Sequence, residues 1–130
     1  MCGRFTLSTS ADDLASFFRL GQLDPIRPRY NVAPTQDVAT VRVLLQGKGR
    51  ELHWLHWGLI PSWARDPAMG SRLINARSET VADKPSFRAA FKRRRCLVLA
   101  DGFYEWKQLA SKQKQPYLIR MRDGSPFGIA

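Results

Sequence analysis

The sequence predicts a single α+β domain, built mainly from short strands with a few short helices. Strand-length apolar stretches recur along the chain between turns that contain glycine, proline or aspartate. Apolar residues at helical spacing occur near the start of the chain and again just before residue 96. The chain has 130 residues, of which 44% are hydrophobic and 25% charged. This length suffices for one buried core and not for two, so we interpret residues 1–130 as one domain.

Two helices are predicted from capping residues and apolar spacing. Ser10, with Asp13 three residues later, forms a capping-box pattern. Apolar residues follow at helical spacing, which predicts a helix over about 10–20 that ends near Gly21. Ser86 is predicted to cap a second helix, whose C-terminal end carries a run of basic residues. These basic side chains either form a solvated helix end or contact phosphates.

The other predicted elements are strands. Residues 38–45 and 51–57 alternate apolar and polar side chains on either side of a glycine-containing turn, which predicts a hairpin. Residues 96–100 are continuously apolar, as is typical of a buried strand, so Cys96 is interpreted as a buried structural thiol. Further strands are predicted at 103–107, 116–122 and 126–130.

Positive charge is the strongest compositional feature, with a formal net charge of +10. Residues 1–60 carry seven Lys or Arg against five Asp or Glu, whereas residues 61–130 carry fourteen against six. Such a surface attracts a polyanion, most simply nucleic acid, and its binding is expected to weaken steeply with salt. The alternative is that the charge serves solubility alone.

Composition also excludes several classes of protein. No apolar run approaches the length of a transmembrane helix, and no signal-peptide pattern begins the chain, so we expect an intracellular protein without membrane association. Cys2 and Cys96 cannot form a disulfide framework. Neither lies in a Cys-x-x-Cys pair, so the two cysteines are not expected to form a zinc site with His53 and His56. We therefore expect no metal and no cofactor.

Cys2 lies one cleavage away from being an N-terminal cysteine. Removal of Met1 would leave a free α-amine and a thiol on one residue, with pKa values of about 8 and about 8.5 in unperturbed groups. This 1,2-aminothiol condenses with an aldehyde to a Schiff base, which the thiolate then closes to a thiazolidine ring. Because both nucleophiles are tethered, the second addition is effectively unimolecular. Glu105 lies between aromatic residues, where a carboxylate either loses solvation and suits general acid–base chemistry or simply faces outward from a strand.

Six short segments share the order and approximate spacing of one known family across the whole chain. They are MCGRF at 1–5, RYNVAP at 29–34, WGLIP at 57–61, INARSET at 74–80, ADGFYEWK at 100–107 and KQPY at 114–117. Together they resemble the SOS-response-associated peptidase (SRAP) family of abasic-site processing proteins. A single segment of this kind would be a weak signal, whereas the ordered set is highly specific.

The resemblance implies a mainly antiparallel β pseudo-barrel with a few short peripheral helices. It also implies covalent capture of abasic sites in single-stranded DNA, by lyase-like Schiff-base chemistry that protects the lesion during the DNA damage response. In that reaction Cys2 is the nucleophile through both its amine and its sulfur, and it also takes part in the autoproteolytic release of Met1. Asn75 orients the opened sugar, and Glu105 shuttles protons during Schiff-base formation and ring closure.

The same resemblance implies a set of DNA-binding residues. Arg4 and Arg77 suit the phosphates that flank the lesion, because a guanidinium engages two oxygens at once. Trp63 and Pro34 are expected to pack against bases or to wedge the strand. The implied partner is single-stranded DNA that contains abasic sites. The implied location is the cytoplasm, on the nucleoid when bound to DNA, or the nucleus if the source is eukaryotic.

One departure from the family concerns a histidine. The family carries it in a His-x-Arg-Met-Pro segment downstream of the strand that begins at 126–130, whereas His53 and His56 lie on the other side of the motifs. Neither can take that role. We therefore expect this sequence to be the N-terminal portion of the family domain, with the C-terminal part of the fold missing. Strand edges left unpaired in this way predict self-association.

Two other functions remain open from the sequence. A cysteine peptidase would use Cys2 to attack a peptide carbonyl, assisted by Asn75 or Glu105, although no histidine is placed to activate the thiol. A non-catalytic binder of single-stranded DNA would use the basic and aromatic residues alone. Blocking the α-amine separates the three, because it abolishes the crosslink while sparing plain binding and thiol-only proteolysis.

Overall fold

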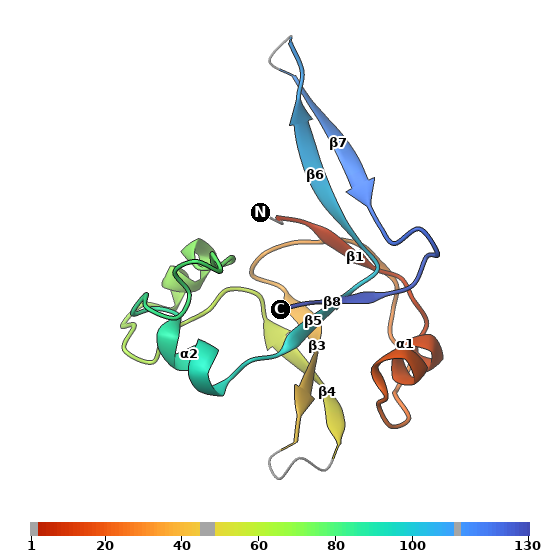
Figure 1. Ribbon diagram of the computed structural model, residues 1–130, viewed down its shortest axis with the longest axis horizontal. Helices are drawn as coiled ribbons and strands as arrows, with labels where there is room; N and C mark the ends of the chain where they lie inside the picture. The colour runs from red at the N-terminus through yellow and green to blue at the C-terminus, as the bar shows by residue number, and fades with distance from the viewer. Residues whose placement is uncertain (1–2, 45–48, 111–112) are drawn as a thin grey trace.

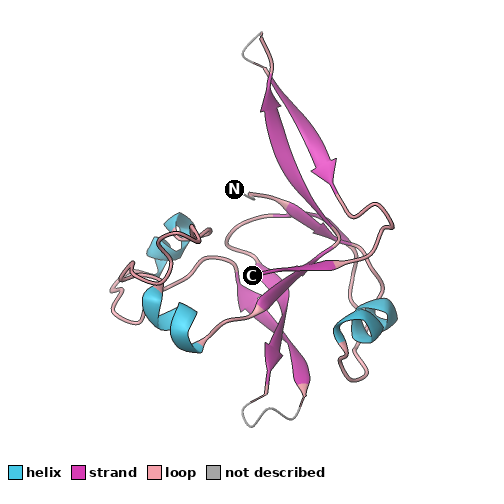
Figure 2. Ribbon diagram, viewed as in Figure 1, coloured by secondary structure: helices cyan, strands magenta, loops and turns pink. Residues whose placement is uncertain are grey.

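Two antiparallel sheets with short helices at their margins make up the structure, a computed structural model that describes residues 3–44, 49–110 and 113–130 (Figure 1). The strand orders are β2-β1-β6-β7 and β4-β3-β5-β8, and every described pairing is antiparallel. The described elements are β1 Phe5–Leu7, α1 Ala11–Phe18, β2 Arg29–Val32, β3 Asp37–Val43, β4 Arg50–His56, the 3₁₀ helix η1 Pro67–Arg72, α2 Arg88–Arg93, β5 Leu97–Ala100, β6 Gly102–Gln108, β7 Lys114–Ile119 and β8 Phe127–Ile129. The predicted α+β fold, mainly antiparallel with a few short helices, is confirmed (Figure 2).

The N-terminal helix α1 is the element that the capping pattern predicted. The Ser10 hydroxyl accepts a hydrogen bond from the Asp13 amide at 3.2 Å, which satisfies one of the free amides of the first turn. The end of the helix differs from the prediction. Arg19, and not Gly21, adopts the left-handed conformation, with φ of 55°, and its amide bonds to the last carbonyls of the helix.

The second helix, α2, begins one residue later than predicted, so Ser86 as its cap was wrong. Phe87 is the N-cap residue, and its side chain makes no capping hydrogen bond. A preceding turn replaces the cap, because the amides of Phe87 and Arg88 both donate to the Lys84 carbonyl at 2.9 Å. The first amides of α2 therefore already have partners, and a side-chain cap is not needed.

The core has two adjoining parts. In the first, α1 covers strands of both sheets, and its buried members are Leu7, Leu14, Phe18, Ala39, Val41 and Leu99. In the second, buried residues pack with the half-buried Trp57 and Phe103 beside them, and the buried members are Phe5, Val32, Val38 and Ala100. Strand β1 contributes to both parts, so burial of its side chains fixes the N-terminal segment in the molecule.

Asp101 joins the turn after β1 to the link between β5 and β6. Its carboxylate accepts hydrogen bonds of 2.5–3.0 Å from the hydroxyls of Thr6, Ser8 and Thr9 and from the amides of Ser8 and Thr9. Burial alone would raise the pKa of Asp101, but these hydrogen bonds outweigh it and hold the pKa below its ordinary value of 3.8. The buried charge is therefore stabilised by donors rather than by a cation.

The hairpin of β6 and β7 extends away from the two sheets, as Figure 1 shows. Glu105 pairs with Tyr117 and Trp106 with Pro116 along this hairpin. All six residues of β7 are exposed, and β7 is an outer strand of its sheet. Because proline lacks an amide hydrogen, Pro116 interrupts the row of donors that a foreign strand would need.

Candidate functional site

The site is built on the start of β1, which lies beside β6. Phe5 pairs with Phe103, and the Tyr104 amide donates to the Arg4 carbonyl at 2.9 Å. Glu105, the predicted proton shuttle, follows directly on β6 and is half-buried. Met1 and the predicted nucleophile Cys2 lie outside the described residues. The structure thus brings Glu105 to the strand that continues the N-terminal segment.

Trp57 connects three of the sequence motifs to this strand. Its ring packs against Phe5 with centroids 5.2 Å apart, and its indole Nε1 donates to the Ile74 carbonyl at 2.9 Å. Its main chain also bonds to the segment after β2, since its carbonyl accepts from Thr35 and its amide donates to Gln36, each at 2.9 Å. The loop with Asn75, the loop with Pro34 and the start of β1 therefore meet around one tryptophan. Sequence reasoning placed Trp57 in a motif but did not give it this role.

A close contact between two glycines holds the segment after Trp57 in place. Gly58 has φ of 140°, and a Cβ built on it would lie 2.6 Å from the Gly70 carbonyl oxygen in η1. The Leu59 amide also donates to the Leu73 carbonyl at 3.0 Å. Only glycine fits at position 58, and its contact fixes where the loop after η1 begins.

That loop carries Asn75, which is half-buried, and Arg77, which is exposed. The Arg77 carbonyl accepts hydrogen bonds from the amides of Thr80 and Val81, so a turn begins directly after the guanidinium-bearing residue. Within the described part of the chain, the buried hydroxyl of Thr80 has no hydrogen-bond partner. Arg77 is thus presented to solvent from a defined turn, beside the loop that Trp57 anchors.

Arg4 is held against β2 by a side chain that the sequence did not single out. Its guanidinium Nη1 donates to the Asn31 side-chain oxygen at 3.2 Å. The Tyr104 hydroxyl donates to the Tyr30 carbonyl at 2.9 Å, which ties β6 to the same strand. Asn31 and Tyr104 lie inside the motifs at 29–34 and 100–107, and this is the only sequence signal that could have found them.

Pro34 and Trp63 differ in how the structure places them. Pro34 is half-buried and directly precedes Thr35, whose amide bonds to Trp57, so it belongs to the cluster of motifs. Trp63 is 56% exposed in the turn closed by the Ala64 amide and the Pro61 carbonyl. Among residues 3–44, 49–110 and 113–130, no hydrogen bond or ring contact joins the Trp63 side chain to the other predicted site residues. Its expected role as a stacking residue stays a prediction.

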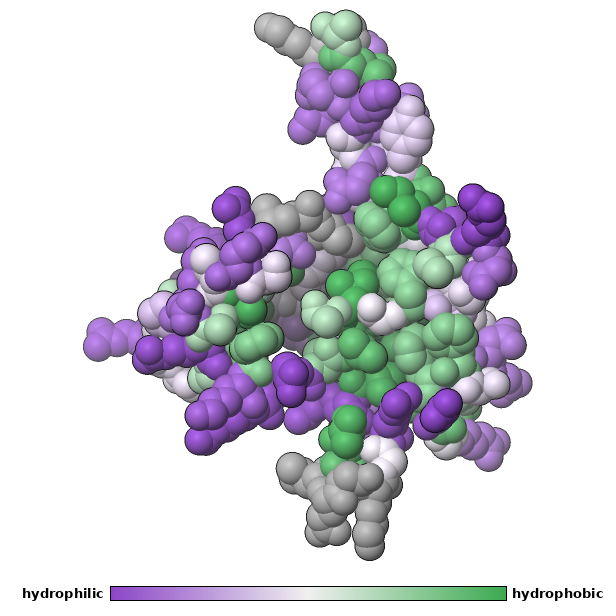
Figure 3. Space-filling model, viewed as in Figure 1, coloured by the Kyte–Doolittle hydropathy of each residue, from purple (hydrophilic) through white to green (hydrophobic). Residues whose placement is uncertain are grey.

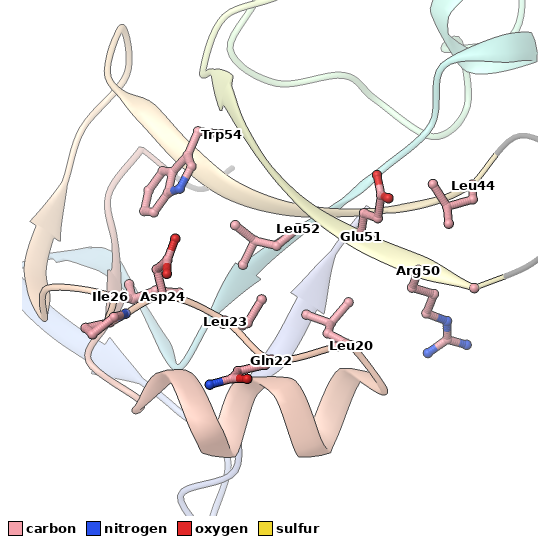
Figure 4. A pocket seen from close by; sticks show the side chains of 13 residues that line it. Leu20, Gln22, Leu23, Asp24, Ile26, Leu44, Arg50, Glu51, Leu52 and Trp54 are labelled. Carbon is pink, nitrogen blue, oxygen red and sulfur yellow. The ribbon is translucent and has the colours of Figure 1, made fainter.

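A separate cavity of about 600 Å³ lies between the segment that follows α1 and the strand β4. Figure 4 shows Asp24 and Glu51 beside the apolar side chains of Leu52 and Trp54. None of the predicted site residues lines this cavity, so it is distinct from the cluster around Trp57.

The described residues contain no cluster of His, Cys, Asp or Glu that could hold a metal ion. His53 instead faces Glu51, with Nε2 and the carboxylate oxygen 3.4 Å apart. Burial raises the pKa of the half-buried Cys96 thiol, and the charge of Arg42 opposes this only in part. Cys96 is therefore a poor thiolate at neutral pH. No described helix is long and apolar enough to cross a membrane.

Comparisons with known proteins agree on one family. The family model described as SOS response associated peptidase (SRAP) matches residues 1–130. Abasic site processing protein YoqW of Bacillus subtilis (strain 168) is 44% identical over 133 residues, covering 100% of this chain and 58% of that protein. Abasic site processing protein YedK of Escherichia coli (strain K12) is 36% identical over 138 residues, with the same two coverages.

A crystal structure of a protein from Bordetella bronchiseptica superposes with a TM-score of 0.79 at 28% identity. It covers 98% of this chain, which in turn covers 61% of that protein. A second, from Bacteroides thetaiotaomicron, gives a TM-score of 0.78 at 26% identity, with coverages of 98% and 57%. The chain thus spans about three fifths of the length of these four proteins.

Proposed function

Because the chain belongs to the SOS response associated peptidase family, we propose that it processes abasic sites in DNA by capturing them covalently through Cys2. The observation that carries this proposal is the meeting of three segments around Trp57 and Phe5. The N-terminal strand, the loop with Asn75 and the strand with Glu105 come from distant parts of the sequence. Asn75 directly follows Ile74, which bonds to Trp57, and Glu105 lies two residues after Phe103, which pairs with Phe5; these neighbours support the roles that we assign to the amide and the carboxylate.

The chemistry follows from the functional groups. An abasic deoxyribose opens to an aldehyde, and the α-amine of Cys2 condenses with it to an imine as one water leaves. The thiolate then adds to the imine carbon, the nitrogen takes up a proton, and a thiazolidine forms. Glu105 gives and takes the protons of both steps, and Asn75 hydrogen-bonds the opened sugar. Met1 has to be removed first, because an amide nitrogen does not form an imine.

Single-stranded DNA is the proposed substrate, because a single strand leaves the opened sugar and its neighbouring bases without a complementary strand. Arg77 is exposed beside the Asn75 loop and suits a flanking phosphate, and Arg4 contributes positive charge at the start of β1. Pro34 lies within the cluster and Trp63 extends into solvent, so the two offer an apolar and an aromatic surface to the unpaired bases.

Intact-mass measurement after incubation with a single-stranded abasic oligonucleotide tests the proposal. Protein without Met1 is expected to gain the oligonucleotide mass minus one water and to keep it without reductant. Cys2→Ser retains the amine but closes a ring far less readily, so its adduct is expected only after borohydride trapping. A stable adduct at Cys2 in protein that retains Met1 would exclude the aminothiol mechanism.

Two further variants test the assigned roles of Glu105 and Asn75. Glu105→Gln keeps the shape of the side chain and removes its titratable proton, so it should slow adduct formation more than it weakens DNA binding. Asn75→Ala should likewise slow capture, because the sugar loses its orienting hydrogen bond. An equal loss of binding and capture in both variants would instead make them docking residues.

A cysteine peptidase is the competing function, because the family description itself names a peptidase. Acetylation of the α-amine of mature protein separates the two activities. Capture is expected to disappear, since the amine is its first nucleophile, whereas a thiol-only peptidase would continue to cleave. Persistent cleavage of a casein substrate, lost in Cys2→Ser, would favour the peptidase.

A further inference from the structure

The helix α2 presents basic and aromatic side chains along one face. Arg88 lies three residues before Phe91 and four before Lys92, which places these three side chains on one side of the helix, and Arg95 follows directly after the C-cap residue, Arg94. Phe91 is 43% exposed, and the Arg95 guanidinium lies 5.9 Å from its ring centroid. We call these four residues the α2 patch.

Among the described residues, no carboxylate pairs with the cations of the α2 patch. Its three cations are exposed, and within the described part of the chain none of them forms an ion pair. Like charges four residues apart on a helix, such as Arg88 and Lys92, repel each other and destabilise it. A bound polyanion would relieve this repulsion, so the arrangement favours binding of a polyanion at this face.

The surface beside the α2 patch is hollowed. A cavity of about 670 Å³ is lined by all four patch residues together with Ala82, Ala89 and Arg93. In Figure 3 hydrophilic side chains gather at the lower left, where Figure 1 places α2, and apolar surface lies among them. Guanidinium and ammonium groups around an exposed ring suit phosphates and one stacked base, which is the recognition pattern of a single strand.

The α2 patch is also connected to the candidate site. Consecutive turns run from Arg77 to α2, because the Val81 amide donates to Arg77, the Lys84 amide to Thr80 and the Arg88 amide to Lys84. A cavity of about 380 Å³ has Trp57, Ile74 and Phe91 among the residues that line it. The helix and the loop that carries Asn75 thus border the same cavity.

We propose that the α2 patch is a second contact surface for single-stranded nucleic acid, where Arg88, Lys92 and Arg95 bind backbone phosphates and Phe91 stacks on a base. This surface rests on the DNA partner of the proposed function but not on the chemistry of Cys2. With this surface the protein binds further nucleotides of the same strand beyond the captured sugar.

Fluorescence anisotropy with an undamaged, labelled single-stranded oligonucleotide tests this surface without the covalent step. Arg88→Ala/Lys92→Ala is expected to weaken binding roughly tenfold at low salt and to reduce the slope of log affinity against log salt by about 1.4, or about 0.7 per lost phosphate contact. The matched control is Arg120→Ala/Arg122→Ala, which removes the same charge from exposed residues after β7 and should change affinity by less than about twofold. Arg88→Lys/Lys92→Arg keeps both charges and should bind like the wild type.

Equal losses in the α2 variant and its control would reduce the effect to net charge and overturn the proposal. So would a loss in the charge-preserving variant, or stronger capture by phosphatidylserine vesicles than by the oligonucleotide. Phe91→Leu should weaken oligonucleotide binding about fivefold and leave inorganic polyphosphate binding unchanged. An equal loss for both ligands would overturn the stacking role. If covalent capture fails while oligonucleotide binding still depends on the α2 patch, the proposed function is wrong and the proposed contact surface is supported.

Discussion

Asp101 is a buried carboxylate with five hydrogen-bond donors and a lowered pKa. Because its pKa is lower in the folded than in the unfolded protein, its stabilisation is complete above about pH 4 and disappears as pH falls through the folded pKa. Asp101→Asn should destabilise the protein by about 2–3 kcal/mol at pH 7, since hydrogen bonds to a charged group are lost. The difference from the wild type should shrink below pH 4.

Urea unfolding at pH 7 and pH 3 measures this difference. Asp24→Asn, at an exposed position, serves as the control and should leave stability nearly unchanged at both values. If the gap between Asp101→Asn and the wild type were the same at pH 7 and pH 3, the carboxylate would not be the stabilising species.

Trp57 offers a test of whether one indole hydrogen bond positions the Asn75 loop. Trp57→Phe keeps a ring against Phe5 but leaves the Ile74 carbonyl without its donor, at a cost of about 1 kcal/mol in stability. Capture of an abasic oligonucleotide should slow, because Asn75 follows Ile74 directly. Binding of undamaged DNA should change little.

Single-turnover adduct rates and anisotropy separate these two effects. Trp54→Phe is the matched control, since Trp54 is exposed on β4. Identical adduct rates in Trp57→Phe and Trp54→Phe would show that the hydrogen bond is structural only.

Among the elements, η1 is fixed by its glycine contact with the segment after β4. Gly58→Ala would put a Cβ 2.6 Å from a backbone oxygen at a φ that alanine rarely adopts, which should cost about 2–3 kcal/mol. The loop after η1 should move with it, so both thermal stability and capture are expected to fall. Gly21→Ala is the control, because its Cβ would meet no atom within 4 Å. Unchanged thermal melting of Gly58→Ala would contradict the close contact.

Elements with their own periodicity were predictable from the sequence. The apolar–polar pattern predicted the hairpin of β3 and β4, although β3 buries four consecutive residues, 38–41, instead of alternate ones. The sequence of β5 is continuously apolar, and α1 has both a cap and an apolar face. Strand β1 has three residues, too few to show a period, and its partners on β2 and β6 are distant in the sequence. The 3₁₀ helix η1 depends on tertiary contact with Gly58, which no local pattern reveals.

Motifs in the sequence name Asn75 and Glu105 as site residues, and this assignment stays a prediction. Their spatial arrangement could not be predicted, because it depends on Trp57, whose indole could have faced solvent or core from sequence alone. Arg4 likewise needed β2 to be placed before its contact with Asn31 could be seen. The roles of these residues in catalysis and binding stay predictions, and so does that of Cys2.

The molecule as a whole carries its positive charge mostly after residue 60. If Arg77 and the α2 patch all engage phosphates, four contacts release counterions, and log affinity should fall with log salt at a slope of about −3 for a single strand. Anisotropy titrations between about 50 and about 200 mM salt measure this slope. A flat response would mean that charge does not drive binding.

Self-association through strand edges also stays a prediction for the whole molecule. β7 and β2 are the outer strands of one sheet, and β4 and β8 are those of the other. Pro116 in β7 and the net charge of +10 both oppose pairing between copies. Sedimentation velocity at low and high salt measures the oligomeric state. It tests whether pairing of strand edges outweighs charge repulsion between copies.

The pairing of β1 with β6 sets an order of events during synthesis. Strand β1 can pair with β2 early in synthesis, because Phe5 pairs with Val32. It can pair with β6 only after Phe103 has been synthesised. At roughly 5–20 residues per second, a ribosome needs about 5–20 s to reach that residue. Through that interval the nascent β1 lacks its β6 neighbour, and the sheet that contains both strands cannot be completed.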